Sequence, residues 1–323
     1  MFHVRGRIRF DGLCTASAAR WPSLLTDPLS TNPENSETNM AEITPEMVRR
    51  LRERTGAGLM ECKRALEGAK GDEEVAIDNL RKSGLKSAEK KGSREMGEGR
   101  VQAWIAPKAR VGAIVALTCE TDFVANTDDY NGLLSEIVQN VAEKNPASVE
   151  ALLEFSDSRT KATIGESIKL FIGKLGENTQ VARLQRYENM KGRVGTYVHH
   201  DKKKAALVSV TTEAEEAVAA TFLKELSMHI VSKVPAPLAL SRDEIPAAEV
   251  ERERAIYMEE VVGKPAEMQE KIVKGKLDKF FADVILTEQK WVFDDTKTVA
   301  KVVEERLGKG SKIEGFTHLR IGR

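Results

Sequence analysis

Apolar residues recur at helical spacing through residues 40–85, and this pattern predicts three short helices. Thr44 is a candidate N-cap, because a proline and an acidic residue follow it at the first helical positions. The apolar positions of the three helices are Met47, Val48, Leu51, Leu59, Cys62, Leu66, Ala69, Ala76, Ile77 and Leu80. Helices this short are unstable alone, so we expect them to share one small core. Gly84 is expected to end the third helix, and the polar residues 86–98 are expected to form a flexible connector.

A gapless internal match joins two distant parts of the chain. Residues 99–120 align with residues 192–213, and both segments begin with Gly-Arg-Val. Each contains two β-rich runs around a charged turn, which is typical of a hairpin, and an amphipathic helical pattern follows each. These matches predict a duplicated α+β core with antiparallel hairpins. We assign residues 99–190 to its first half, and residues 191–237 and 284–323 to its second half.

Two strongly charged helical runs interrupt the second half within residues 238–283. They cover residues 247–262 and 266–281, and a Gly-Lys-Pro turn separates them. Helices joined by a short turn pack antiparallel, so the narrow apolar seam predicts an inserted helical hairpin of the coiled-coil type. Further elements are expected as two strand segments within 284–293, a helix over 298–307 and a strand over 313–321.

The first 39 residues differ from the rest of the chain. They are rich in arginine, poor in acidic residues, and end in a run rich in Ser, Thr, Pro and Asn. Such a leader fits an organelle transit peptide. The alternative, which we favour, is a wrongly assigned start with Met40 as the true first residue. Under both interpretations we expect residues 1–39 to be disordered, and we exclude them from the fold prediction.

Charge and cysteine usage narrow the class of protein. Lys+Arg and Asp+Glu both number 50, and this balance disfavours a dedicated nucleic-acid binder, which is usually basic. The three cysteines form no CxxC pair, which favours a reducing compartment and a cytoplasmic protein. Cys62 and Cys119 lie in apolar patterns and are expected to be buried. No apolar run approaches the length of a membrane-spanning helix.

The sequence contains no recognisable catalytic constellation. The Gly-Ala-Gly at 56–58 lacks the context of a dinucleotide fingerprint, and no phosphate-binding loop ends in Gly-Lys-Ser/Thr. The histidines show no metal-ligand spacing. His229 lies on the inner side of a predicted helix, where a satisfied core histidine is the expected state. No covalent catalysis, metal or cofactor is therefore expected.

The two repeats diverge at one strand-to-helix turn. After Glu120 the first repeat reads Thr-Asp-Phe-Val-Ala-Asn, whereas the second reads Ala-Glu-Glu after Glu213. An aromatic residue at such a turn either packs against the start of the helix as a hydrophobic staple or contacts a partner. The residue pattern alone favours the staple, because single exposed aromatics are common.

Two motifs carry a resemblance to a known family. Residues 51–66, Leu-Arg-Glu-Arg-Thr-Gly-Ala-Gly-Leu-Met-Glu-Cys-Lys-Arg-Ala-Leu, resemble the amino-terminal signature of the elongation factor Ts family. Residues 121–125, Thr-Asp-Phe-Val-Ala, resemble its second signature and follow in the family's order. The resemblance covers residues 40–323. It implies an amino-terminal three-helix module similar to ubiquitin-associated domains (UBA-like), a two-part core and an inserted helical hairpin.

The resemblance also implies which residues meet a partner, elongation factor Tu. In the family, an Asp-Phe pair enters elongation factor Tu beside its nucleotide and disturbs Mg²⁺ coordination. That role falls here on Asp122 and Phe123, with Thr121 and Val124 shaping the turn. The amino-terminal module is expected to dock through Arg52, Leu59, Met60 and Lys63. The second half of the core is expected to contact another domain of the partner through Leu175, Gly176 and His199.

The function implied by the resemblance is guanine nucleotide exchange on elongation factor Tu during translation. The expected assembly is a heterodimer or a dimer of heterodimers, with no direct binding of nucleotide, nucleic acid or membrane by this chain. One alternative is an adaptor that binds ubiquitin or a peptide through Arg52, Met60 and Leu66. Another is an RNA-binding protein that uses the basic runs 202–204 and 86–94, although such runs are usually solvated faces.

Overall fold

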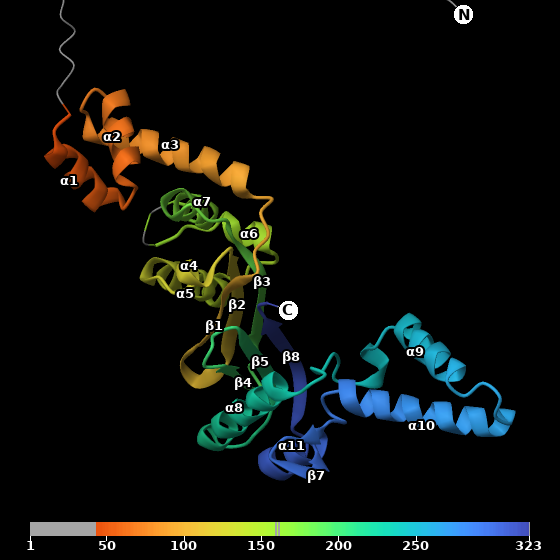
Figure 1. Cartoon of the computed structure of the whole chain (residues 1–323). Coiled ribbons are helices and arrows are strands. Elements are labelled where there is room, and N and C mark those ends of the chain that lie inside the picture. The colour runs from red at the N-terminus through yellow and green to blue at the C-terminus, as the bar shows by residue number, and fades with distance from the viewer. Residues whose placement is uncertain (1–42, 159, 161, 323) are drawn as a thin grey trace, which may run out of the picture. The chain divides into compact units, whose positions relative to one another are not determined.

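The computed structural model describes residues 43–158, 160 and 162–322, and it combines helices with antiparallel sheets (Figure 1). The prediction of an α+β fold is therefore confirmed. The expected disorder of residues 1–39 concerns a segment outside the described residues. The division of the core into domains stays a prediction, as does the likeness of the first module to ubiquitin-associated domains.

Three helices form the amino-terminal part of the described chain: α1 Pro45–Thr55, α2 Leu59–Gly68 and α3 Glu73–Lys91. The Thr44 hydroxyl accepts a hydrogen bond from the backbone N–H of Met47 and so caps α1, as its sequence context predicted. Leu51, Cys62 and Leu66 are fully buried in one cluster that all three helices supply. This common core explains why such short helices are stable here.

Helix α3 is longer than the sequence pattern predicted. It continues through Gly84 to Lys91, so the expected helix end at Gly84 was wrong and the first part of the predicted connector 86–98 is helical. The reason is a close crossing with α7 (Ile164–Leu175). A Cβ atom on Gly173 would lie 2.7 Å from the Cα of Gly84. Gly84 therefore allows two helices to approach and does not end one.

Two three-stranded antiparallel sheets form the core. The first has the order β1-β2-β3 and the second the order β4-β5-β8. Their strands are β1 Glu98–Ile105, β2 Val111–Cys119, β3 Thr179–Glu188, β4 Gly192–Val198, β5 Lys204–Thr211 and β8 Lys312–Arg320. Gly99 pairs with Thr118 in the first sheet, and Gly192 pairs with Thr211 in the second. The aligned repeats thus have the same cross-strand register.

The similarity of the two sheets extends to their irregularities. The pairing of β2 with β3 shifts register after Ala116, and the pairing of β5 with β8 shifts after the aligned Ser209. In both sheets the third strand comes after a helix that ends at a glycine with positive φ. These glycines are Gly176, with φ 83°, and Gly308, with φ 93°. Such detail is expected when one α+β unit occurs twice.

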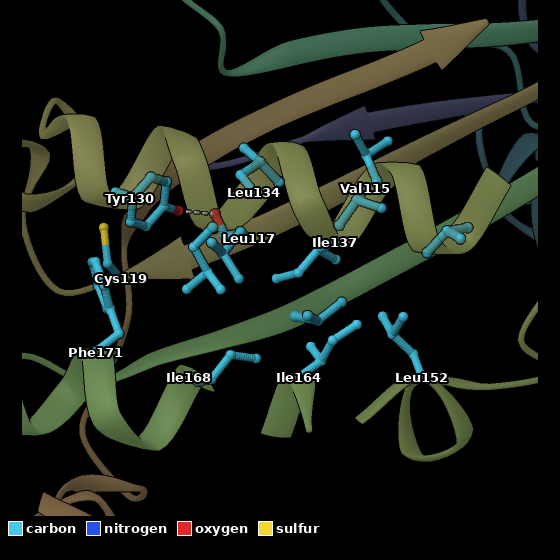
Figure 2. Close-up of a cluster of buried hydrophobic side chains, with 14 of the residues drawn as sticks. Val115, Leu117, Cys119, Tyr130, Leu134, Ile137, Leu152, Ile164, Ile168 and Phe171 are labelled. Atoms are coloured by element: carbon cyan, nitrogen blue, oxygen red, sulfur yellow. Dashed lines mark hydrogen bonds between the residues drawn. The ribbon is translucent and has the colours of Figure 1, made fainter. Parts of the chain in front are cut away.

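Helices cover the outer face of each sheet. In the first half these are α4 Asp122–Ala125, α5 Asp128–Lys144, α6 Val149–Leu153 and α7, and a short 3-10 helix Pro107–Ala109 joins β1 to β2. Figure 2 shows side chains of α5, α6, α7 and β2 meeting in one apolar cluster. In the second half, α8 Glu216–Ser232 packs on β4 and β5, and α11 Val299–Leu307 packs against α8. The small ribbon of β6 Lys290–Trp291 and β7 Asp294–Thr298 lies beside α11.

Successive residues along β2 point to opposite faces of the first sheet. Val115 and Leu117 face the helices, whereas Ile114 and Ala116 join a cluster that residues of the second sheet share. The members from the second sheet are Val194, Ala205, Leu207 and Leu319, and Ile321 directly after β8 joins them. The two sheets therefore pack against each other, and each carries its helices on the side away from the other.

Two further helices, α9 Ala247–Glu259 and α10 Ala266–Val284, follow a 3-10 turn at Arg242–Glu244 and contact each other. The ammonium of Lys276 on α10 lies 5.4 Å from the ring centroid of Tyr257 on α9. Helix α10 extends through Val284, so the strand expected to begin there was wrong, and the first strand of this region begins at Lys290. Coiled-coil geometry for this pair stays a prediction.

Candidate functional site

The single-turn helix α4 follows directly on β2 and carries the second sequence motif. We call residues 121–126 the Phe123 turn. Thr121 is its N-cap, with the hydroxyl accepting from the backbone N–H of Val124 over 3.4 Å. Val124 and Ala125 are buried, whereas 82% of Phe123 is exposed. The residue pattern favoured a hydrophobic staple, and this prediction is wrong, because the ring points into solvent and does not pack against the helix.

One carboxylate holds the start of the Phe123 turn. The backbone N–H of Thr121 donates to Glu177 Oε2 over 3.0 Å, and the Thr121 hydroxyl donates to Glu177 Oε1 over 2.6 Å. Glu177 lies in the loop between α7 and β3. Hydrogen bonds to an ionised acceptor are stronger than neutral ones, so this contact fixes the first residue of the turn.

The end of the turn is held from β1 and by the helix that follows. Arg100 Nε donates to the carbonyl of Ala125 over 2.5 Å, and its guanidinium also donates to the Asn126 side chain. The hydroxyl of Tyr130, in the first part of α5, donates to the carbonyl of Leu117 on β2 (Figure 2). The turn that presents Phe123 is thus bounded by fixed residues on both sides.

The charge around the turn is mixed. Asp122 is exposed, and the Lys203 ammonium forms an ion pair with Glu98 over 2.5 Å. Hydrogen bonding to Glu98, together with the charge of Asp122, raises the pKa of Lys203. The nearby Cys119 is buried, and burial raises the pKa of its thiol to about 11. A thiol that stays protonated at neutral pH is a poor nucleophile, so Cys119 has a packing role.

The residues proposed for the amino-terminal module lie on the surface. Leu59 is 52% exposed and Met60 is 61% exposed at the start of α2. Lys63 is exposed one turn further along α2, and Arg52 is exposed on α1. Exposed apolar side chains next to cations suit a protein partner. Their role in binding stays a prediction.

The three residues assigned to the second half of the core do not lie together in it. Leu175 and Gly176 end α7, which packs on the first sheet. Their assignment to the second half was therefore wrong, because the loop after α7 leads into β3 of the first sheet. His199 lies in the β4–β5 turn, with Nδ1 3.2 Å from Asp201 Oδ1 and its ring 4.1 Å from that of His200.

Glu177 and Arg100 were not among the predicted site residues. Glu177 directly follows Leu175 and Gly176, which were predicted. Its contact with Thr121, however, joins residues that are far apart in the sequence of the first half of the core. Local patterns of hydrophobicity do not report such a contact. The internal alignment did identify Arg100 as a residue shared with Arg193. The alignment did not predict the hydrogen bonds of Arg100 to the Phe123 turn.

Across residues 43–158, 160 and 162–322, no group of three or more His, Cys, Asp or Glu side chains is placed to hold a metal ion. A cavity of about 490 Å³ lies between the first three helices and α7. None of the described helices is long and apolar enough to cross a membrane.

Comparison with known proteins shows that the sequence is similar to one family. The family model described as "Elongation factor TS" matches residues 120–323. A protein named Elongation factor Ts from Symbiobacterium thermophilum is 40% identical over 275 residues, which cover 84% of this chain and 88% of that protein. Proteins of the same name from Clostridium botulinum (strain Eklund 17B / Type B) and Desulfovibrio desulfuricans are 37% and 36% identical. The matches cover 87% of this chain in both cases, and 93% and 99% of those proteins.

Proposed function

This chain belongs to the elongation factor Ts family, and from that premise we propose that it is a nucleotide exchange factor for elongation factor Tu in translation elongation. It binds elongation factor Tu in the GDP form and promotes release of GDP without covalent chemistry of its own. We assign the activity to the cytoplasm and to a heterodimer of the two proteins.

The observation that carries the proposal is the exposed ring of Phe123. A large apolar ring that is 82% exposed on a turn held at both ends is ready to enter a partner without a change in its own fold. A ring with few rotatable bonds loses little entropy on insertion. Asp122, also exposed, brings a carboxylate to the same place.

Thermodynamic linkage explains how binding alone releases GDP. If this chain binds nucleotide-free elongation factor Tu more tightly than the GDP form, the affinity for GDP falls by the same factor. Mg²⁺ at such sites joins phosphate oxygens to a few protein oxygens. We assign to Asp122 and Phe123 the displacement of those protein supports, which weakens the hold on the phosphates.

The remaining proposed contacts position the turn. In the proposal, the exposed residues at the start of α2 dock the amino-terminal module on the nucleotide-binding domain of elongation factor Tu. Leu175 and Gly176 add contacts near the Phe123 turn, whereas His199 reaches another domain of the partner. Contacts far from the nucleotide then supply binding energy, and this energy drives the distortion of the nucleotide site of elongation factor Tu.

Truncation of Phe123 to alanine tests the proposal. Loss of a buried aromatic anchor typically costs about 2 kcal/mol or more, so Phe123→Ala should lower the second-order rate of GDP release by about 30-fold. The fold should survive, because the exposed ring contributes little packing. Stopped-flow fluorescence of labelled GDP leaving elongation factor Tu measures the rate. Met190→Ala is the matched control, because it also truncates an exposed apolar side chain, 62% exposed, away from the turn.

Capture experiments separate this function from the alternatives. Elongation factor Tu should be retained by the immobilised chain and released by excess GDP. Retention of ubiquitin with no effect of GDP would instead indicate an adaptor. A strongly salt-dependent affinity for RNA would indicate an RNA-binding protein. Equal rates of GDP release with the wild type and Phe123→Ala would exclude the role assigned to the ring.

A further inference from the structure

The carboxylate of Glu177 joins two segments that are far apart in the sequence. Its two oxygens accept from the backbone N–H and the hydroxyl of Thr121. Because that hydroxyl gives its proton to Glu177, its lone pairs remain free to accept from the backbone N–H of Val124. The carboxylate therefore sets the orientation of the N-cap on which the Phe123 turn depends.

The loop that carries Glu177 is fixed on both sides. Gly176 before it adopts φ 83° and ends α7. Asn178 after it is buried, and its N–H donates to the Glu120 carboxylate over 2.6 Å. Its side-chain amide also donates to two carbonyls of the connector that precedes β1. Glu177 thus holds the turn from a rigid support.

The second half of the core gives an internal comparison. Strands β3 and β8 pair in matching register with β2 and β5, and this alignment places Lys309 at the position of Glu177. Thr121 aligns with Ala214, which has no hydroxyl. Lys309 is exposed. The half with the exposed aromatic turn therefore has a carboxylate and a hydroxyl where the other half has a cation and a methyl group.

We propose that Glu177 is a positioning residue for nucleotide exchange, which acts through Thr121 to hold the Phe123 turn in the conformation that enters elongation factor Tu. The inference rests on the proposed function and adds a residue outside both sequence motifs. Without the carboxylate the turn occupies several conformations. Only the fraction in the competent conformation then acts on the partner.

Glu177→Gln tests the proposal with little change in side-chain size. The amide places an NH₂ donor where two donors of Thr121 need acceptors. We expect GDP release at saturating concentration of the variant to be about tenfold slower, because hydrogen bonds to a charged group are lost. The concentration for half-maximal rate should change by less than about threefold, because the other docking residues are intact. Glu177→Asp, which keeps both acceptors, should recover part of the rate.

Two comparisons separate positioning from a general structural effect. Lys309→Ala changes the equivalent position of the other half and should leave the rate of GDP release unaltered. In a background with both Asp122→Ala and Phe123→Ala, Glu177→Gln should cause no further loss, because Glu177 acts through the turn that carries these two side chains. An additional tenfold loss in that background would overturn the proposal.

Amide hydrogen exchange tests the contact without elongation factor Tu. In Glu177→Gln the amides of Thr121 and Val124 should exchange at least about tenfold faster, while those of α5 keep their wild-type rates. Wild-type exchange at both amides would overturn the positioning role. The wild-type chain could fail to accelerate GDP release while these amides exchange as expected. That result would exclude the proposed function but would support the Glu177 contact.

Discussion

Phe123 and Val124 are adjacent apolar residues with opposite environments. Successive residues of a helical turn point about 100° apart, so a single turn capped by Thr121 turns Val124 inward and Phe123 outward. Hydrophobicity alone would bury both. The direction of the ring is decided by the hydrogen bonds that orient the turn, and those come from Glu177 and Arg100.

A second residue with an unusual environment is His229, which is fully buried on α8. Its Nδ1 accepts from the backbone N–H of Val292 over 3.2 Å, and its Nε2 lies 3.0 Å from Gln289 Oε1. The neutral ring with a proton on Nε2 satisfies both partners. It also stacks on Trp291, with ring centroids 5.1 Å apart. The expectation of a satisfied core histidine is confirmed.

This environment predicts a specific dependence of stability on pH. Burial lowers the pKa of His229 to about 4, with a smaller contribution from the charge of Lys233. Between about pH 6.5 and 4 the unfolded chain therefore binds a proton that the folded chain does not. The stabilisation is complete above pH 6.5 and is lost as the pH falls toward 4, at up to about 1.4 kcal/mol per pH unit.

Urea unfolding of the wild type and His229→Asn between pH 7.5 and 5 measures this effect. The asparagine does not titrate, so the difference in the free energy of unfolding between the two proteins should shrink as the pH falls. His318, whose pKa burial also lowers, is present in both proteins and cancels. A difference that stays constant over this range would show that the His229 pKa is not depressed.

At the scale of elements, the crossing of α3 and α7 depends on a pair of glycines with unequal space. A Cβ on Gly173 would lie 2.7 Å from the Cα of Gly84, whereas a Cβ on Gly84 would lie 3.7 Å from the Cα of Gly173. The first distance is a clash with backbone, and the second is an ordinary contact. The two positions therefore differ in their tolerance of alanine.

We predict that alanine lowers the stability of the protein at position 173 and does not lower it at position 84. Gly173→Ala forces the helices apart at a cost of up to about 3 kcal/mol. The gain in helix propensity is about 1 kcal/mol, so we expect a net loss of stability of up to about 2 kcal/mol. Gly84→Ala keeps that gain without the clash and should leave stability equal or higher. Chemical denaturation of the two variants tests this. Equal destabilisation by both would contradict the crossing as described.

The sequence predicted most elements of the fold, because periodicity and capping residues are local signals. The repeats even predicted the matching hairpins around Gly99 and Gly192. The end of α3 could not be predicted, since Gly84 has the same local signature whether it ends a helix or allows a crossing. In the site, the motif identified the Phe123 turn. It could not identify Glu177, because that residue reaches Thr121 only through tertiary structure.

At the scale of the whole core, the two halves share a layer of side chains between their sheets. Ile114 is fully buried in that layer together with Val194 and Leu207 of the second sheet. The fit is tight, since a Cβ on Gly112 would lie 2.6 Å from Val194 Cγ1. A shared, close-packed layer couples the stability of the half that carries Phe123 to that of the half that carries His199.

Ile114→Ala tests this coupling. Truncation of a buried isoleucine costs roughly 2–5 kcal/mol, and because the lost contacts lie between the sheets, protection of amides in both α5 and α8 should fall by the same factor. Val273→Ala is the contrasting variant, since Val273 is buried in the α9–α10 pair. It should lower amide protection in those two helices alone. If Ile114→Ala lowered protection in α5 but not in α8, the halves would be independently stable, and the spacing of Phe123 and His199 would need another source of rigidity.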